Sequence, residues 1–74
     1  MFYRTVATVL DGWRGDLSYG EVARRTGLSV PGVSEVLRGV VVPRPETIAA
    51  LCGALGRTEA DLMRAVGAAA PSES

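Results

Sequence analysis

Histidine and lysine are absent from this 74-residue sequence, and Cys52 is its only cysteine. Without histidine and with one thiol, the chain has no set of side chains that could hold zinc, and it cannot form an internal disulfide. The same absences exclude histidine-based acid–base catalysis and nucleophiles activated by histidine. We therefore expect a protein that is not an enzyme and that needs no cofactor or metal ion.

Long apolar runs are also missing. The longest mostly apolar stretch spans residues 48–56, whereas a transmembrane helix needs about 20 apolar residues. The first residues, Met1–Arg4, lack the charged start, apolar middle and small-residue cleavage site of a signal peptide. Because 47% of the residues are apolar, the composition is that of a packed domain. We expect a small cytoplasmic protein with no membrane partner.

The net charge of zero conceals an uneven distribution along the chain. Residues 1–45 carry six arginines and four acidic residues, a net charge of +2, whereas residues 46–74 carry a net charge of −2. Basic charge in the first half can form a local patch for phosphate groups, although the imbalance is small.

Apolar residues recur at helical spacing between short turn signals. Positions 6, 9, 10 and 13 form one apolar stripe, and positions 48, 51, 52 and 55 form another. Ser18 is a good N-cap, with Glu21 three residues later to complete a capping box. The five predicted helices are residues 3–13, Ser18 to about Thr26, Ser29–Gly39, Pro45–Gly56, and a short one that starts at a Thr58–Asp61 box and includes Val66. We expect one domain over residues 1–67 and a flexible tail over residues 68–74.

The stretch Tyr19–Arg38 places two capped helices on either side of a tight turn. Two short helices joined in this way must cross at a steep angle, and the crossing restricts the residue types. Ala23 is small where the helices would pass closest, and Leu28 can fill the junction. Gly27 can adopt the positive φ that the turn requires. These three residues at these offsets predict a helix-turn-helix arrangement.

Further motifs extend the pattern on both sides of this stretch. The sequence contains S-x-x-E-V-A at Ser18–Ala23, T-G-L-S at Thr26–Ser29, G-x-x-x-P at Gly39–Pro43 and E-T-I-A-A-L-C-G-A-L-G at Glu46–Gly56. With the preceding amphipathic helix, residues 3–67 resemble the Cro/repressor superfamily of helix-turn-helix proteins, often called the XRE family. The resemblance implies an all-α, five-helix Cro/repressor-like helix-turn-helix domain.

In that family the second helix of the motif lies in the major groove of double-stranded DNA, so the resemblance implies a sequence-specific DNA-binding transcriptional regulator. The expected DNA-binding residues are Ser18, Tyr19, Ser29, Val30, Pro31, Ser34, Glu35, Arg38 and Arg44. Val30 and Pro31 can contact a thymine methyl group, and Glu35 can accept a hydrogen bond from a cytosine amino group. Arg38 is the strong cationic contact, and Arg14 could flank the groove.

Several residues have two interpretations. Glu35 either contacts a base or is a surface residue that weakens nonspecific binding. Arg24 is either a DNA ligand or part of a solvated helix face. The run Val40–Val42 either packs inside the monomer or lies in a partner interface. Trp13 and Cys52 lie on apolar stripes, so we expect both of them in the core, with Cys52 as a buried structural thiol.

One recognition helix reads only a few base pairs, so we expect a homodimer that spans two half-sites. The surfaces expected to join the two copies are either Val40–Val42 or the set of Leu62, Met63 and Val66. A second function is compatible with the same fold. On that interpretation the protein is an interaction module, partner-docking or antitoxin-like, which binds another protein through its third helix and Val40–Val42.

Overall fold

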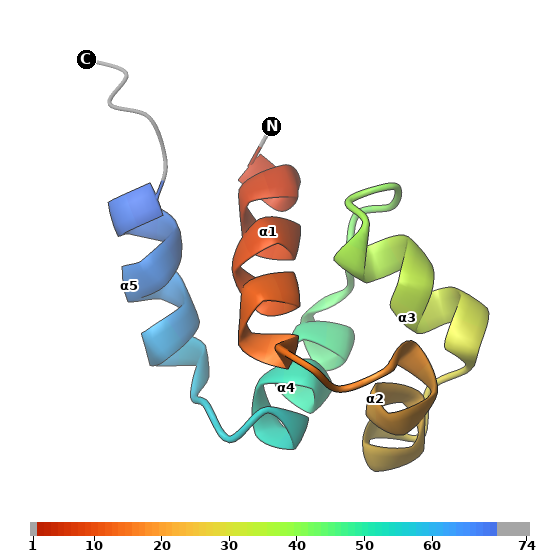
Figure 1. Ribbon diagram of the computed structural model, residues 1–74. Coiled ribbons are helices and arrows are strands. Elements are labelled where there is room, and N and C mark those ends of the chain that lie inside the picture. The colour runs from red at the N-terminus through yellow and green to blue at the C-terminus, as the bar shows by residue number, and fades with distance from the viewer. Residues whose placement is uncertain (1, 70–74) are drawn as a thin grey trace.

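Five helices and no strand make up residues 2–69, the part of the chain that this computed structural model describes. The helices are α1 (Phe2–Arg14), α2 (Tyr19–Thr26), α3 (Val30–Leu37), α4 (Pro45–Ala54) and α5 (Glu59–Ala69). In Figure 1, α1 stands between α5 and α3 and packs against both, with α2 and α4 below. The predicted all-α, five-helix fold is confirmed. Within the described range, no helix has the length and apolar character needed to cross a bilayer.

Two helix ends differ from the prediction. α3 ends at Leu37 rather than at Gly39. Gly39 has a φ of +73°, and the following amide, of Val40, donates to the carbonyl of Glu35 at 2.9 Å, which closes the helix. α5 continues to Ala69, two residues into the segment predicted as a tail, because alanine favours helix. The rest of that segment, residues 70–74, lies outside the described residues.

Side-chain caps begin the second, third and fifth helices, as the sequence predicts. The hydroxyls of Ser18 and Ser29 each accept a hydrogen bond from the amide three residues later, at 3.0 and 3.1 Å. Before α5, Thr58 and Asp61 form the complete capping box, in which each side chain accepts from the other residue's amide. The hydrogen bonds from Thr58 hold the pKa of Asp61 below its usual value.

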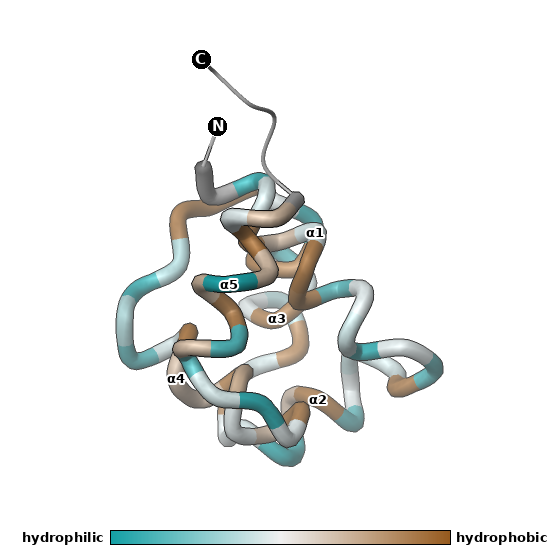
Figure 2. The backbone as a smooth tube through the Cα atoms, turned by 90° about the vertical axis from the view of Figure 1, so that its left-hand side faces the viewer, coloured by the Kyte–Doolittle hydropathy of each residue, from teal (hydrophilic) through white to brown (hydrophobic). Residues whose placement is uncertain are grey.

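The hydrophobic core receives residues from all five helices. Its buried members are Val6, Leu10, Val22, Ala23, Val33, Val36, Leu37, Leu51, Cys52, Leu62 and Val66. Along α5 in Figure 2, hydrophobic positions alternate with hydrophilic ones, as expected for a helix with one face on the core. Trp13 packs against this core, as predicted, and the guanidinium of Arg57 lies 4.7 Å from the centre of its ring. Among the described residues, no polar or charged residue is buried.

The expectation that Leu62 and Val66 form a dimer surface is wrong. Both residues are 2% exposed, because α5 packs them into the core of the monomer. Met63 points the other way and is 59% exposed. Cys52 is buried, as predicted, and this burial raises the pKa of its thiol.

The run Val40–Val42 divides between the two interpretations. Val41 is half-buried and packs against the core, so one of the three valines stabilises the monomer. Val40 and Val42 are 56% and 70% exposed. Only these two residues of the run are available for an interface.

Gly27 provides a direct test of the turn. Its φ is +78°, and its amide donates to the carbonyl of Ala23 at 2.8 Å. A Cβ atom at this position would meet nothing within 4 Å, so a substitution costs backbone strain alone. We expect Gly27→Ala to lower the free energy of unfolding by about 1–2 kcal/mol, measured by chemical denaturation.

Gly12→Ala is the matched control, because Gly12 is helical and also has open space at its Cβ position. This change should raise the stability by about 0.5–1 kcal/mol. A Gly27→Ala variant as stable as the parent would show that the turn tolerates an ordinary side chain.

Candidate nucleic-acid interface

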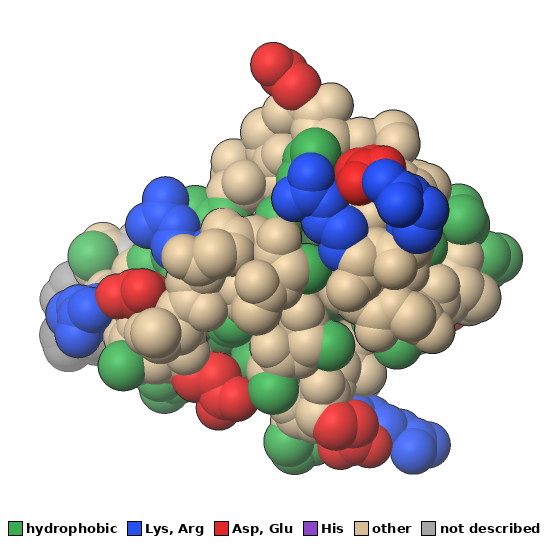
Figure 3. Space-filling view, turned by 90° about the horizontal axis from the view of Figure 1, so that it is seen from below, with side chains coloured by type: hydrophobic (Ala, Val, Ile, Leu, Met, Phe, Trp, Pro, Cys, Tyr) green, Lys and Arg blue, Asp and Glu red, His purple; other side chains and the backbone are tan. Residues whose placement is uncertain are grey.

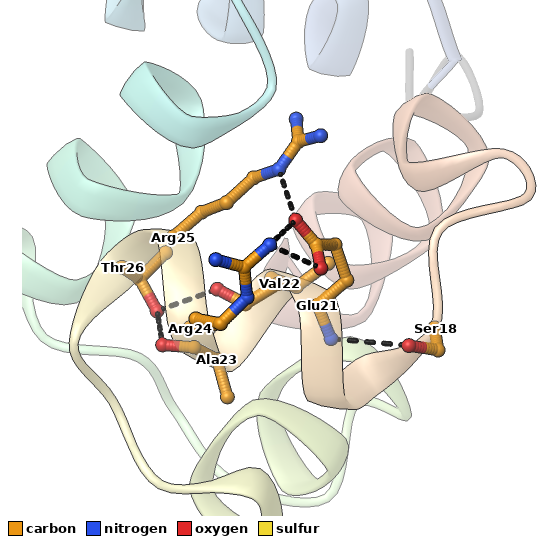
Figure 4. Close-up of polar contacts among 7 residues, drawn as sticks. All are labelled: Ser18, Glu21, Val22, Ala23, Arg24, Arg25 and Thr26. Carbon is orange, nitrogen blue, oxygen red and sulfur yellow. Dashed lines mark hydrogen bonds and ion pairs between the residues drawn. The ribbon is translucent and has the colours of Figure 1, made fainter.

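A three-residue turn, residues 27–29, joins α2 to α3. On the inner side of α2, Val22 and Ala23 are buried at 0% and 6% exposure, and Leu28 packs against the same core from the turn. The hydroxyl of Thr26 donates to the carbonyl of Val22 at 2.9 Å and accepts from the amide of Leu28 at 3.2 Å. Thr26 therefore ties the end of α2 to the turn, a role that the sequence analysis did not assign. Figure 4 shows the bonds of its hydroxyl to the carbonyls of Val22 and Ala23.

The residues of α3 separate cleanly into two sides. Its inner side is made by Val33, Val36 and Leu37, all buried. The other side, here called the outward face of α3, is made by Val30, Pro31, Ser34, Glu35 and the C-cap residue Arg38. All five belong to the predicted site, and all are exposed except Ser34, which is half-buried. The helix thus presents five of the nine predicted residues together.

The other predicted residues lie at three helix starts. Ser18 and Ser29 are the exposed N-caps of α2 and α3, and Arg44 is the exposed N-cap of α4, without a side-chain capping bond. Tyr19 is different, since it is half-buried and packs against the core. The guanidinium of Arg14 lies 4.8 Å from the centre of the Tyr19 ring.

A hollow of about 210 Å³ separates α3 from the segment that leads into α4. Ser29, Gly32 and Glu35 line it on one side, and Arg44 and Thr47 line it on the other. A Cβ atom at Gly32 would lie 3.0 Å from the Ser29 hydroxyl, so glycine leaves room for the cap. The sequence analysis missed Gly32 and Thr47, because this hollow forms only when the segment after α3 folds back beside it.

Ion pairing distinguishes the arginines near the motif from one another. Arg14 pairs with Asp11, Arg24 and Arg25 pair with Glu21, and Arg64 pairs with Asp61. Within the described part of the chain, Arg38 and Arg44 form no ion pair with an acidic side chain. On the face seen in Figure 3, acidic side chains lie beside basic ones in several places, so that face carries no continuous basic patch.

Glu21 does not complete the predicted capping box with Ser18. Ser18 accepts from the Glu21 amide, but the Glu21 carboxylate turns to the arginines of its own helix (Figure 4). It accepts from Arg24 at 2.8 Å and from Arg25 at 2.9 Å. Hydrogen bonds from these two guanidiniums lower the pKa of Glu21. Arg24 is 76% exposed and paired with Glu21, so it belongs to a solvated, ion-paired helix face.

The sequence profile of a family described as a helix-turn-helix domain matches residues 8–66. The protein belongs to this family. The family is of the Cro/repressor kind, so the resemblance predicted from the sequence is confirmed. No curated protein matches the sequence. Helix-turn-helix domains bind DNA with the second helix of the motif, which is α3 here, and membership therefore indicates DNA binding.

Arg14 has a positioning role in this helix-turn-helix domain. Its guanidinium donates to the carboxylate of Asp11 at 2.8 Å and to the carbonyl of Leu17 at 2.7 Å, and the Leu17 amide donates back to the Arg14 carbonyl at 3.0 Å. Together with the stacking on Tyr19, these contacts hold the segment that leads into α2. These contacts give Arg14 an internal role, and the expectation that it also flanks the DNA groove stays a prediction.

We expect Arg14→Lys to lower the free energy of unfolding by about 1–2 kcal/mol, because an ammonium group cannot match the fork that binds Asp11 and Leu17 together. The Arg14 side chain is only 22% exposed, so solvent screens these bonds only in part. The control is Arg64→Lys, whose side chain is 72% exposed and whose pair should contribute little. Equal urea midpoints for the two variants would contradict the positioning role.

Proposed function

We propose that the protein is a sequence-specific transcriptional regulator that binds double-stranded DNA. The outward face of α3 enters the major groove, and Ser18, Tyr19, Ser29 and Arg44 contact the flanking phosphates. The observation that carries the proposal is that Arg38, on this face, and Arg44, across the hollow from it, have no acidic partner among the described residues. The arginines of α2, in contrast, are already neutralised by Glu21.

Helix starts support the phosphate contacts. The first amides of an α-helix have no intrahelical partner, and the helix dipole adds positive potential there. Ser18 and Ser29 cap two such starts and are exposed. Phosphate contacts of this kind position the protein on the duplex, whereas the outward face of α3 supplies the contacts to the bases. A regulator of this kind acts in the cytoplasm, where we place the protein.

Arg38→Ala should weaken binding to selected DNA about tenfold and make the plot of log affinity against log salt shallower by about one unit. Arg38 is exposed at the end of α3, so its removal leaves the core unchanged. Fluorescence anisotropy with labelled duplexes at several salt concentrations measures both quantities. Arg64→Ala, which removes the same charge from α5, is the control and should keep the parent's affinity. If the two variants bind equally well, Arg38 does not belong to the site.

The proposed working species is a symmetric homodimer. A single α3 offers few groups that distinguish bases, and two copies related by a twofold axis place their recognition helices in successive major grooves, about 34–36 Å apart. The surface proposed for the contact is formed by Val40 and Val42, which are apolar, exposed and outside α3. Met63 is the large hydrophobic residue that remains exposed on the described part of α5.

Sedimentation equilibrium at micromolar concentration, with and without selected DNA, tests the dimer. We expect two protein chains per duplex for the parent and one for Val42→Asp, because a carboxylate placed in the apolar contact is costly to bury. Met63→Asp adds the same charge on α5 and should leave the stoichiometry at two. A parent protein that stays monomeric under both conditions would contradict the dimer.

An interaction module is the second candidate function, and one observation favours it. The large hydrophobic residues exposed in the described part of the chain are Val30, Val40, Val42 and Met63, and the first of these lies on α3 itself. On this alternative, α3 and the connector bind a partner protein rather than DNA. Failure of the purified protein to enrich any duplex from a random pool would favour this function over DNA binding.

A further inference from the structure

We propose that α3 reads a half-site in which a thymine lies close to a cytosine, with Glu35 as the residue that selects the cytosine. The carboxylate of Glu35 accepts a hydrogen bond from the N4 amino group of cytosine, and Val30 and Pro31 contact the methyl group of thymine. The inference rests on the proposed DNA binding and adds to it the bases that this particular helix distinguishes.

The chemistry of a carboxylate restricts what Glu35 can read. An ionised carboxylate only accepts hydrogen bonds. In the major groove, cytosine presents an amino donor, whereas guanine presents two acceptors and thymine one acceptor and its methyl group. Adenine presents its amino donor beside the acceptor N7, which repels the second oxygen of a carboxylate. Cytosine is therefore the base edge that Glu35 fits.

Glu35 is free to make this contact. It is exposed, and it forms no ion pair or side-chain hydrogen bond within residues 2–69. This is notable because Arg38 follows it by three residues, the spacing at which Glu21 binds Arg24. Arg38, the C-cap of α3, keeps right-handed helical angles, and its amide still donates to the Ser34 carbonyl at 3.0 Å, yet its guanidinium does not pair with Glu35. The outward face thus keeps an unpaired anion beside an unpaired cation.

Arg44 makes the position of Glu35 compatible with a groove lined by phosphates. The two residues line opposite sides of the hollow next to α3 without forming an ion pair. A carboxylate that enters the major groove is repelled by the phosphates, and a nearby guanidinium reduces that repulsion. Arg44 can bind the backbone from the same hollow while Glu35 reaches the base edge.

Apolar groups occupy the first turn of α3. Val30 is 47% exposed, and Pro31, which has no amide hydrogen, is exposed beside it. The apolar feature available in the major groove is the thymine methyl group. Glu35 follows Val30 by five positions, which is about 7.5 Å along a helix. That length corresponds to roughly two base-pair steps, so the thymine and the cytosine should lie two or three positions apart.

Selection of random duplex DNA by three purified proteins tests the assignment of Glu35. The proteins are the parent, Glu35→Gln and Glu59→Gln, which removes the same charge from an exposed position on α5. We expect the parent to prefer cytosine at one position of each half-site by roughly tenfold. Glu35→Gln should replace this preference by adenine, because an amide both accepts from N6 and donates to N7. Glu59→Gln should retain cytosine.

The outcomes separate this inference from the proposed function. If the parent and Glu35→Gln enrich the same sequence, DNA binding stands and Glu35 does not read a base, which overturns the inference alone. If the two proteins enrich the same sequence and Glu35→Gln also binds every duplex more tightly, Glu35 acts only by repelling the phosphates of the DNA backbone. If the parent enriches no sequence and binds no duplex, both the inference and the proposed function fail.

A chemical substitution in the DNA tests the thymine contact. Deoxyuridine lacks only the methyl group of thymine, so replacing the thymine two or three positions from the selected cytosine should weaken binding of the parent several-fold. For Val30→Ala, the affinities for the thymine duplex and the deoxyuridine duplex should differ less than they do for the parent, since the substitution shortens the side chain that contacts the methyl group. A parent that binds both duplexes equally well would overturn the thymine assignment.

Discussion

Helices α2 and α3 have eight residues each, a length at which an isolated helix is not stable in water. Their stability comes from a serine cap at each start, a left-handed glycine after each end, and burial of one side in the shared core. All of these contacts use the inner side or the ends of the helices. The outward face of α3 makes none of them, so its residues can be chosen for binding without a cost to folding.

Local patterns in the sequence carried enough information to predict the fold. Caps and glycines are read from a few neighbouring residues, which is why the starts of α2 and α3 and the left-handed turn at Gly27 were predicted correctly. The burial of Leu62 and Val66 was not predicted, because apolar residues on the last helix have the same spacing in a core as in an interface. Only the packing of α5 against α1 decides between the two.

The candidate site was predicted less completely, for a related reason. The outward face of α3 follows from helical periodicity, and all its members were expected. An arginine is available to contact DNA only if no acidic side chain pairs with it, and sequence spacing alone does not determine these ion pairs. An acidic residue precedes Arg24 and Arg38 by the same three positions, yet only the first pair forms. The contacts of Arg14 with Leu17 and Tyr19 arise from the path of the chain between α1 and α2, which no local pattern specifies.

Because Cys52 is buried in the core, the reaction of its thiol with a reagent reports local unfolding of the domain. This thiol is the only one in the chain, is 1% exposed, and has a pKa raised by burial, so the reactive thiolate is scarce in the native state. A thiol reagent can therefore modify it only in molecules whose α4 has separated from the core. The labelling rate then measures the free energy of that opening under native conditions, without denaturant and without any change to the sequence.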